Sequence, residues 1–361
     1  MARYNEDIQQ VIGMSSQKKS VTIGGLAIGK NAPIRVESML KTPVTDIEGC
    51  RQELEALKGE GCELVRVAFP DMDCLHSLKV LLKISEIPIM ADIHFDAKLA
   101  KAALEAGCMA IRINPGNMPK SGLADVVRLA RDKKAVIRIG SNSGSLNNVQ
   151  LEQAGGNKAK ALFIAVQDQV KILEDMGFDD IILSSKSTSI AETVNANLMI
   201  SRHFPQYPVH IGMTEAGAIP EGLIKSASGI SLLLMQGIGD TLRISLSAPA
   251  TEEIRAGYAL LRSLGLRKKG VEVISCPACG RRRLDVAKLV EQIRPMLKDL
   301  PDGTVVAIMG CEVNGPREAM EADIGVAGTP HGVVIFKKGE VVGHLGEGEM
   351  EKVGLLFKGL L

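Results

Sequence analysis

The last third of the chain carries three cysteines whose spacing suits metal chemistry. Cys276 and Cys279 are separated by two residues in SCPACGR, and Cys311 follows an apolar run in MGCEVNGPREA. Two cysteines separated by two residues on a turn can direct both thiolates at one metal. Glu318 follows the Gly315-Pro316 turn, which can return its carboxylate toward the metal bound by Cys311. The spacing therefore predicts a site of three thiolates and one carboxylate.

Zinc and an iron-sulfur cluster both fit this ligand set. Structural zinc sites favour closed shells of thiolates and histidines, and neither His331 nor His344 has zinc-finger spacing. A weak carboxylate ligand instead suits a cluster iron that must bind substrate. A redox dithiol at Cys276 and Cys279 and a structural zinc ribbon stay open as alternatives.

The other cysteines occur singly. The chain has seven cysteines, an odd number that argues against a disulfide framework. Four of them fall on predicted helices or strand starts, where a thiol is usually a small buried hydrophobic residue. These are Cys50, Cys62, Cys74 and Cys108.

The first two thirds of the chain repeat one structural pattern. Short runs rich in valine and isoleucine alternate with helical stretches, which is typical of βα units around a parallel sheet. Eight such runs predict an α/β fold with an N-terminal TIM-type (β/α)8 barrel. The preceding VTIGGLAIGK predicts a hairpin that closes the barrel floor. The runs span 34–39, 63–69, 89–95, 110–116, 136–142, 180–186, 209–215 and 241–247.

Most of these runs begin with apolar residues and end with charged, amide or hydroxyl residues. The carboxyl ends of barrel strands meet on one face, where active sites of this fold are built. Four arginines and a lysine at one mouth would repel each other without an anionic guest, so we expect a phosphorylated ligand. Pairing with acidic neighbours at the rim is the simpler alternative. The candidates are Ser38, Arg66, Asp92, His94, Arg112, Asn114, Asn117, Arg138, Asn142, Lys186, Glu215, Arg243 and Ser245.

Composition excludes several classes of protein. The 361 residues are 45% hydrophobic, which allows a large core and more than one domain. The 43 basic and 42 acidic residues give no global basic field for nucleic acid. The sequence has neither a signal-peptide apolar region nor a run of about 18 apolar residues, so we expect a cytoplasmic protein without a membrane span.

The pattern predicts three successive parts of the chain. Residues 1–250 form the substrate-binding barrel, and 251–270 form a linker helix that ends at a basic, glycine-terminated turn. Residues 271–361 form a small α+β domain with two apolar strands, an amphipathic helix over DVAKLVEQIRPMLKDL, a short helix after Pro316 and a hairpin around Lys338-Gly339.

The motifs SCPACGR and MGCEVNGPREA, together with VESM, RINPGN, RIGSNSGSL and TEAG, resemble those of the 4-hydroxy-3-methylbut-2-enyl diphosphate synthase family of the bacterial two-domain type. The resemblance covers almost the whole chain, and the two C-terminal motifs are its most specific part. It implies reductive dehydration and ring opening of 2-C-methyl-D-erythritol 2,4-cyclodiphosphate to 4-hydroxy-3-methylbut-2-enyl diphosphate, in isoprenoid precursor biosynthesis. Flavodoxin or ferredoxin would supply the two electrons.

The resemblance also implies roles for individual residues. A 4Fe-4S cluster would be bound by Cys276, Cys279, Cys311 and Glu318, and Glu215 would lie beside the reacting carbons. The family further implies a head-to-tail homodimer, in which the cluster domain of one chain caps the barrel of the other. The implied substrate ligands are Arg66, Arg112, Arg138, Asn142, Lys186, Arg243 and Ser245.

Two residues depart from the family pattern. Glu37 stands in VESM where the family usually has glutamine, and Ala68 follows Arg66-Val67 where threonine is more typical. An extra carboxylate would weaken anion binding unless it points away or meets a lysine such as Lys41. The second functional hypothesis is a barrel that only binds a phosphorylated ligand, with a zinc-stabilised interaction module attached.

Overall fold

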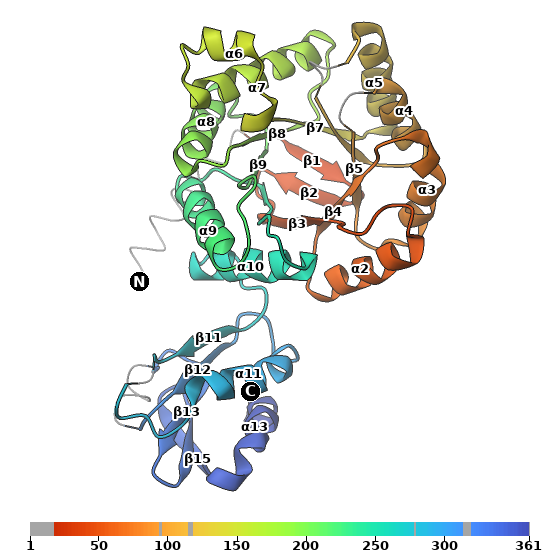
Figure 1. Ribbon diagram of the computed structural model, residues 1–361. Helices are drawn as coiled ribbons and strands as arrows, with labels where there is room; N and C mark the ends of the chain where they lie inside the picture. The colour runs from red at the N-terminus through yellow and green to blue at the C-terminus, as the bar shows by residue number, and fades with distance from the viewer. Residues whose placement is uncertain (1–17, 94–95, 115–117, 278, 313–318, 361) are drawn as a thin grey trace. The chain divides into compact units, whose positions relative to one another are not determined.

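The computed structural model describes residues 18–93, 96–114, 118–277, 279–312 and 319–360. The chain divides into two compact units, a barrel unit that ends at Leu260 and a C-terminal unit that begins at Leu261. Figure 1 shows the elements of both. Among the described residues, no helix is long and apolar enough to cross a membrane.

The barrel unit is built around eight parallel strands that close on themselves, so the predicted TIM-type barrel is confirmed. Each predicted run contains one strand, and β10 closes the ring because Thr241 and Leu242 pair with Arg35 and Val36 of β3. The strands are β3 (Arg35–Met39), β4 (Leu64–Ala68), β5 (Ile89–Asp92), β6 (Ala110–Ile113), β7 (Val136–Asn142), β8 (Ile181–Lys186), β9 (Val209–Ile211) and β10 (Thr241–Leu242).

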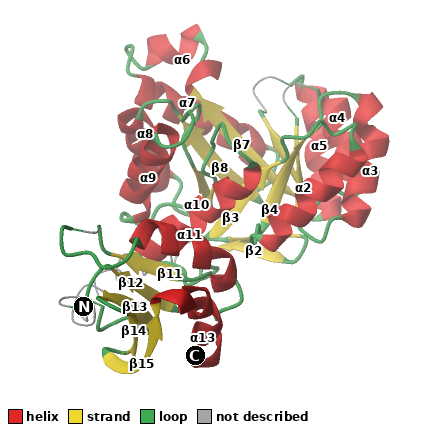
Figure 2. Ribbon diagram, turned by 60° about the horizontal axis from the view of Figure 1, so that its bottom comes forward, coloured by secondary structure: helices red, strands yellow, loops and turns green. Residues whose placement is uncertain are grey.

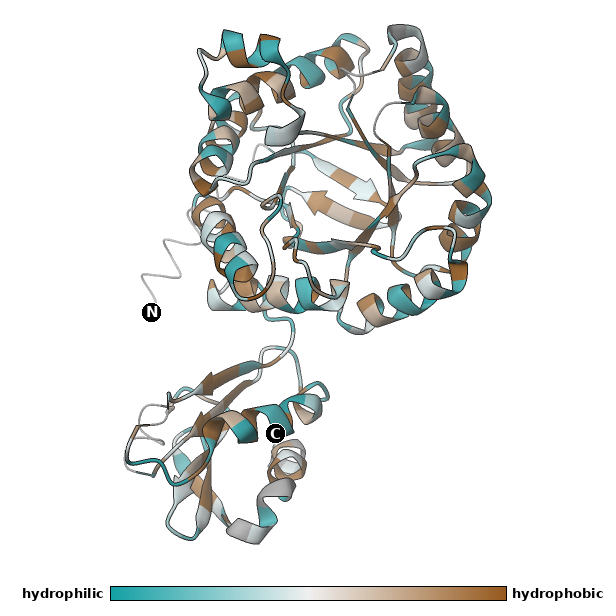
Figure 3. Ribbon diagram, in the orientation of Figure 1, coloured by the Kyte–Doolittle hydropathy of each residue, from teal (hydrophilic) through white to brown (hydrophobic). Residues whose placement is uncertain are grey.

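Helices surround this barrel, as Figures 1 and 2 show. Asp46, Asp96, Asn157 and Ser189 accept hydrogen bonds from backbone N–H groups in the first turns and so fix where four of the helices begin. The helices are α2 (Ile47–Gly59), α3 (Leu75–Ile84), α4 (Ala97–Glu105), α5 (Lys120–Lys133), α6 (Asn148–Gln153), α7 (Lys158–Asp175), α8 (Ile190–His203), α9 (Glu221–Leu234) and α10 (Ala250–Ser263). In Figure 3 the barrel strands are mostly hydrophobic and the helices alternate between hydrophobic and hydrophilic residues, as expected for helices with one buried face.

The predicted hairpin covers the amino-terminal end of the barrel. Strands β1 (Ser20–Ile23) and β2 (Leu26–Gly29) pair antiparallel through a turn in which Gly24 and Gly25 have positive φ. Val21, Ile23 and Ile28 of the hairpin are buried against residues at the starts of β4 to β8. Those partners are Leu64, Met90, Ala110, Val136 and Ile182. With this end filled by apolar side chains, a ligand can enter only from the other end.

Residues 251–270 were expected to form a linker helix, but the helix covers only the first part of this segment. Helix α10 ends at Ser263 and belongs to the barrel, because Ile254 is fully buried and the Tyr258 hydroxyl donates to the Gly61 carbonyl at 2.7 Å. A Cβ atom on Gly257 would lie only 2.7 Å from Val36, so the helix packs closely on β3. An apolar stripe on α10 therefore makes it the last barrel helix, and the expected boundary at residue 250 falls before it.

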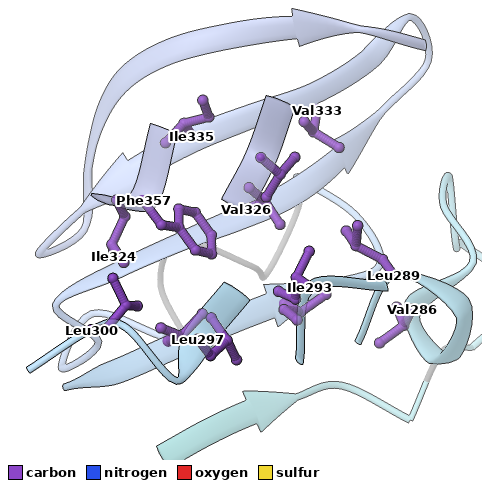
Figure 4. Close-up of a cluster of buried hydrophobic side chains, with 13 residues drawn as sticks. Val286, Leu289, Ile293, Leu297, Leu300, Ile324, Val326, Val333, Ile335 and Phe357 are labelled. Atoms are coloured by element: carbon purple, nitrogen blue, oxygen red, sulfur yellow. The ribbon is translucent and has the colours of Figure 1, made fainter. Parts of the chain in front are cut away.

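The C-terminal unit contains one five-stranded mixed sheet with the order β11-β12-β13-β14-β15. Strands β11 to β13 are parallel, and β13 to β15 are antiparallel. Helices α11 (Val286–Leu297) and α13 (Val353–Leu360) supply Ile293, Leu297 and Phe357 to the core on one face of the sheet (Figure 4). The strands are β11 (Glu272–Ser275), β12 (Val305–Met309), β13 (Ile324–Thr329), β14 (Gly332–Lys337) and β15 (Glu340–Gly346).

The small α+β domain is confirmed, with two elements that were not predicted. Strand β13 has the sequence IGVAGT, whose small residues give a weak strand signal. A Cβ atom on Gly325 would lie 2.3 Å from the ring of Phe336, so only glycine fits there. Helix α13 was also missed. The short helix expected after Pro316 falls largely outside the described residues, and 319–321 form a turn.

Candidate active site

The predicted cationic side chains surround one cavity of about 230 Å³ in the barrel. Asn142, Glu215 and Ser245 also line it, as do Ser184, Met213 and Thr214, which were not predicted. Asn114 and Ser38 are not part of this lining, while His94 and Asn117 lie outside the described residues. The five cations of the lining are Arg66, Arg112, Arg138, Lys186 and Arg243.

The sequence indicated that the cations lie at the ends of strands, but three of the arginines lie inside strands. Arg66, Arg112 and Arg138 are each the third residue of their strands, β4, β6 and β7. Arg112 pairs in register with Arg138, so both side chains point to the same side of the sheet. A long arginine stem can start in the barrel interior and still carry its guanidinium to the mouth. The upper interior of this barrel is therefore polar.

Three buried carboxylates contact the arginines. An oxygen of Asp92 lies 3.4 Å from Nε of Arg66, and its other oxygen lies 3.6 Å from Nη1 of Arg112. Glu253, on α10, accepts from Nε of Arg243 at 3.0 Å and from Nη2 at 3.2 Å. The alternative of acidic pairing is thus partly right, although these carboxylates are buried in the barrel instead of exposed at its rim.

Glu37 is the third of these carboxylates and does not meet Lys41. It is 1% exposed, and its two oxygens accept from Nη1 of Arg138 at 2.7 and 2.8 Å. Lys41 instead pairs with Glu253 at 3.0 Å. The extra carboxylate is therefore compensated by an arginine of the cavity itself.

One nitrogen of Arg138 remains available to a guest. Among the described residues, Nη2 of Arg138 is buried without a hydrogen-bond partner. An unsatisfied buried donor of this kind is costly, and an anionic oxygen in the cavity would satisfy it. Burial also lowers the pKa of Arg66 to about 10, against the opposing charge of Asp92. Both observations indicate that the cavity favours an anion.

Glu215 occupies a strained position at the mouth. It lies in the loop after β9, exposed, with a φ of 50° in the left-handed region. A non-glycine residue seldom adopts this conformation, and such residues cluster at functional sites. Its carboxylate is the acidic group of the cavity lining.

Glu253 and His210, which contact Arg243 and Lys186 respectively, were not predicted from the sequence. A signal existed for Glu253, because it falls at helical spacing between Ala250 and Gly257 on the buried stripe of α10. His210 lies within a buried strand and had no such signal.

Two of the three cysteines of the C-terminal unit lie at the carboxyl ends of neighbouring parallel strands. Cys276 directly follows β11, and Cys311 follows β12 after one residue. The backbone N–H of Gly310 donates to Sγ of Cys276 at 3.0 Å. Hydrogen bonds from the backbone and side chain of Arg281 lower the pKa of the exposed Cys279 thiol.

This donor set fits a thiolate-bound cluster. N–H···S hydrogen bonds and a stabilised thiolate are what such a cluster uses. No three cysteine, histidine or carboxylate side chains among the described residues already stand close enough to share a metal ion. Glu318 lies outside the described residues.

The other four cysteines are all buried, as predicted. Burial raises the pKa of Cys50 to about 11 and of Cys62 and Cys108 to about 12. Thiols of this kind are poor nucleophiles and poor metal ligands at neutral pH.

Known proteins match the chain over nearly its whole length. A family model described as GcpE TIM-barrel domain matches residues 18–258, and the GcpE protein C-terminal domain model matches 272–355. The 4-hydroxy-3-methylbut-2-en-1-yl diphosphate synthase (flavodoxin) of Thermodesulfovibrio yellowstonii is 43% identical over 336 residues, which cover 92% of this chain and 96% of that protein. The protein of the same name from Caldanaerobacter subterraneus subsp. tengcongensis is 44% identical over 332 residues, which cover 92% of this chain and 93% of that protein.

Proposed function

The chain belongs to the GcpE family, and from this premise we propose that it converts 2-C-methyl-D-erythritol 2,4-cyclodiphosphate into 4-hydroxy-3-methylbut-2-enyl diphosphate. The conversion opens the ring, removes one oxygen as water, and consumes two electrons and two protons. It is an oxidoreductase reaction in the methylerythritol phosphate route to isoprenoids. The names of the relatives support this activity.

The convergence of five cations on one cavity carries the proposal. Three buried carboxylates contact these cations, so the positive charges outnumber the negative ones by two before the exposed Glu215 is counted. A cyclic diphosphate carries one ionised oxygen on each phosphorus, which matches this surplus. The guanidinium groups offer paired donors to these oxygens, and Nη2 of Arg138 is an unused donor among the described residues.

We propose that Arg66, Arg112, Arg138, Lys186 and Arg243 bind the diphosphate, with Asn142 and Ser245 as neutral donors. With the phosphates fixed, the carbon skeleton would lie toward the mouth. There Glu215, in its protonated form, could give a proton to the departing oxygen. As a carboxylate it would instead stabilise positive charge that develops on carbon.

We further propose that Cys276, Cys279, Cys311 and Glu318 bind a 4Fe-4S cluster. When bound, such a cluster supplies electrons at low potential and a Lewis-acidic iron. The Gly310 N–H group would stabilise the Cys276 thiolate, and Arg281 would do the same for Cys279. A carboxylate is the weakest of the four ligands, which suits replacement by substrate.

The electron donor and the assembly extend this proposal. The relatives carry flavodoxin in their names, so we propose flavodoxin as the donor, with ferredoxin as a second carrier of the same class. We propose a cytoplasmic, head-to-tail homodimer in which two chains build each site. Mixing inactive Glu215→Gln and Cys276→Ala proteins, with subunit exchange verified by mass spectrometry, should restore about a quarter of wild-type activity. No recovery would exclude a site shared between chains.

Purification without oxygen tests the central proposal. The protein should be brown, contain iron and sulfide, and convert the cyclic diphosphate when given reduced flavodoxin. A colourless protein with one tightly bound zinc and no turnover would instead support the barrel with a zinc-stabilised module.

A further inference from the structure

A chain of buried polar side chains extends from the cavity lining into the barrel wall. Nζ of Lys186, on β8, lies 2.7 Å from Nε2 of His210 on β9. On the other side of the imidazole, Nδ1 lies 2.8 Å from Oγ1 of Thr241 and 3.3 Å from Oε1 of Glu37. His210 and Glu37 are each 1% exposed, and Lys186 is 7% exposed. Of these four residues, Lys186 is the one that lines the cavity.

The hydrogen-bond roles in this chain follow from the carboxylate. Glu37 is ion-paired with Arg138, and an ionised carboxylate accepts hydrogen bonds but donates none. Nδ1 of His210 lies 2.8 Å from Oγ1 of Thr241, its hydrogen-bond partner, and 3.3 Å from Oε1 of Glu37. The negative charge of this carboxylate attracts a proton on Nδ1 and repels a lone pair there, so we assign the proton to Nδ1. A neutral ring with its proton on Nδ1 has a free lone pair on Nε2. Lys186 must therefore be the donor in its contact with His210.

The surrounding charges favour a neutral ring. Burial lowers the pKa of His210 well below its ordinary value, and the charges of Lys186, Arg138, Arg66 and Arg243 lower it further. Burial is also the main cause that lowers the pKa of Lys186, followed by its arginine neighbours, while Glu37 opposes the shift. A buried ammonium in this position needs an acceptor and a nearby negative charge, and the chain provides both.

We infer that Glu37 and His210 are positioning residues for Lys186. Glu37 fixes the tautomer of His210, and Nε2 of His210 then holds the Lys186 ammonium at the cavity, with two N–H groups left for a phosphoryl oxygen. Gly212 gives the lysine its room, because a Cβ atom there would lie 3.1 Å from Nζ and 2.6 Å from the Arg243 carbonyl oxygen. The inference rests on the proposed function, which supplies the diphosphate.

The tautomer can be measured in the full-length protein labelled with 15N-histidine. The chain has six histidines, and the signal that disappears in His210→Gln belongs to His210. We expect a protonated Nδ1 and an unprotonated Nε2, which persist as the pH falls through the ordinary histidine pKa of about 6.5. A proton on Nε2 with none on Nδ1 would overturn the inference.

Binding of inorganic diphosphate, followed by titration calorimetry, tests whether His210 acts through Lys186. We expect Lys186→Met to weaken binding about tenfold or more, since it removes a charge-assisted donor. His210→Leu should weaken binding by a similar factor. His210→Gln should retain most of the affinity, because its side-chain oxygen can accept from Lys186. In the Lys186→Met background, His210→Leu should have no further effect.

The outcomes separate this inference from the proposed function. If wild-type protein does not bind diphosphate, both fail. If it binds, but His210→Leu has no effect or adds fully to Lys186→Met, only the positioning role fails. The matched control is Glu63→Gln, which removes the carboxylate of the 2.7 Å ion pair with Arg35 at the opposite end of the barrel and should leave affinity unchanged. If His210→Leu does not fold, the histidine spectrum and His210→Gln decide the question.

Discussion

Replacing the buried carboxylate of Glu253 should damage the fold and the anion site together. Glu253 is fully buried and accepts hydrogen bonds from Arg243, from the Ser38 hydroxyl at 2.8 Å and from the Leu246 N–H at 3.1 Å. Lys41 also pairs with it at 3.0 Å. Glu253→Leu leaves these donors without their acceptor and leaves the Arg243 charge uncompensated.

The expected loss follows from this environment. Removing one partner of a buried ion pair costs about 3–5 kcal/mol. For a barrel of this size, about 1 kcal/mol corresponds to about 2–4 °C, so the transition should fall by about 6–20 °C. Glu253→Gln keeps a neutral acceptor and should cost less, about 1–3 kcal/mol.

Tyrosine fluorescence is the appropriate assay. The chain has no tryptophan and three tyrosines. Tyr207 and Tyr258 are buried in the barrel unit, and none lies beyond residue 260, so the signal is specific for barrel unfolding. The control is Glu252→Leu, the adjacent residue on α10, which pairs with Arg255 at the surface and should cost at most about 1 kcal/mol.

The pH dependence provides a second measurement. Burial alone would raise the pKa of Glu253, but the charge of Arg243 and hydrogen bonds from Arg243, Leu246 and Lys41 lower it below the ordinary 4.5. A lowered pKa means that the stabilisation is fully present above about pH 4.5 and is lost as the pH falls through the folded-state pKa. The stability difference between wild type and Glu253→Gln should therefore shrink in acid. Equal losses for Glu253→Leu and Glu252→Leu would refute this account of the site.

Three further predictions concern the cluster and the substrate. Alanine at Cys276, Cys279 or Cys311 should abolish the brown colour of anaerobically purified protein, whereas alanine at Cys62 should not; full iron retention in Cys311→Ala would contradict the ligand set. Arg112→Lys should raise the substrate KM about tenfold without changing the visible spectrum, since lysine cannot reproduce a guanidinium fork; unchanged steady-state kinetics would return Arg112 to a structural role. Glu318→Ala should retain much of its iron but lose turnover, and a variant with normal activity would show that this carboxylate is not a ligand.

The barrel could be predicted because each strand carries its own signal. Runs such as VIRIGSN and DIILSSK show strand length, β-branched composition and polar ends without reference to any other part of the chain. Strand β13 lacked this signal because its glycine at position 325 is required by a neighbour, Phe336 on β14. A residue that a partner strand dictates cannot be recognised from its own segment.

The side-chain types of the candidate site were predicted from the sequence, but the ion pairs between them were not. The side-chain types at the strand ends pointed to an anion, yet Glu37 and Arg138 are separated by 101 positions in the sequence. Their contact depends on how eight strands are staggered around the barrel, which local patterns do not contain. For this reason Lys41 was a plausible partner for Glu37 in the sequence, and Arg138 is the partner in the fold.

The buried carboxylates also solve a problem that an anion site creates for folding. Arginines gathered for a ligand repel one another whenever the ligand is absent, and a barrel that must fold empty needs internal counter-charges. Each carboxylate here engages only part of its arginine: Glu37 contacts Nη1 of Arg138 and leaves Nη2 without a partner among the described residues. Glu253 accepts from Nε and Nη2 of Arg243, while Nη1 of Arg243 lies 3.7 Å from Sδ of Met39. At Arg138, one edge of the guanidinium thus stabilises the barrel while Nη2 can still donate to a guest, so a diphosphate can bind without breaking the ion pair with Glu37.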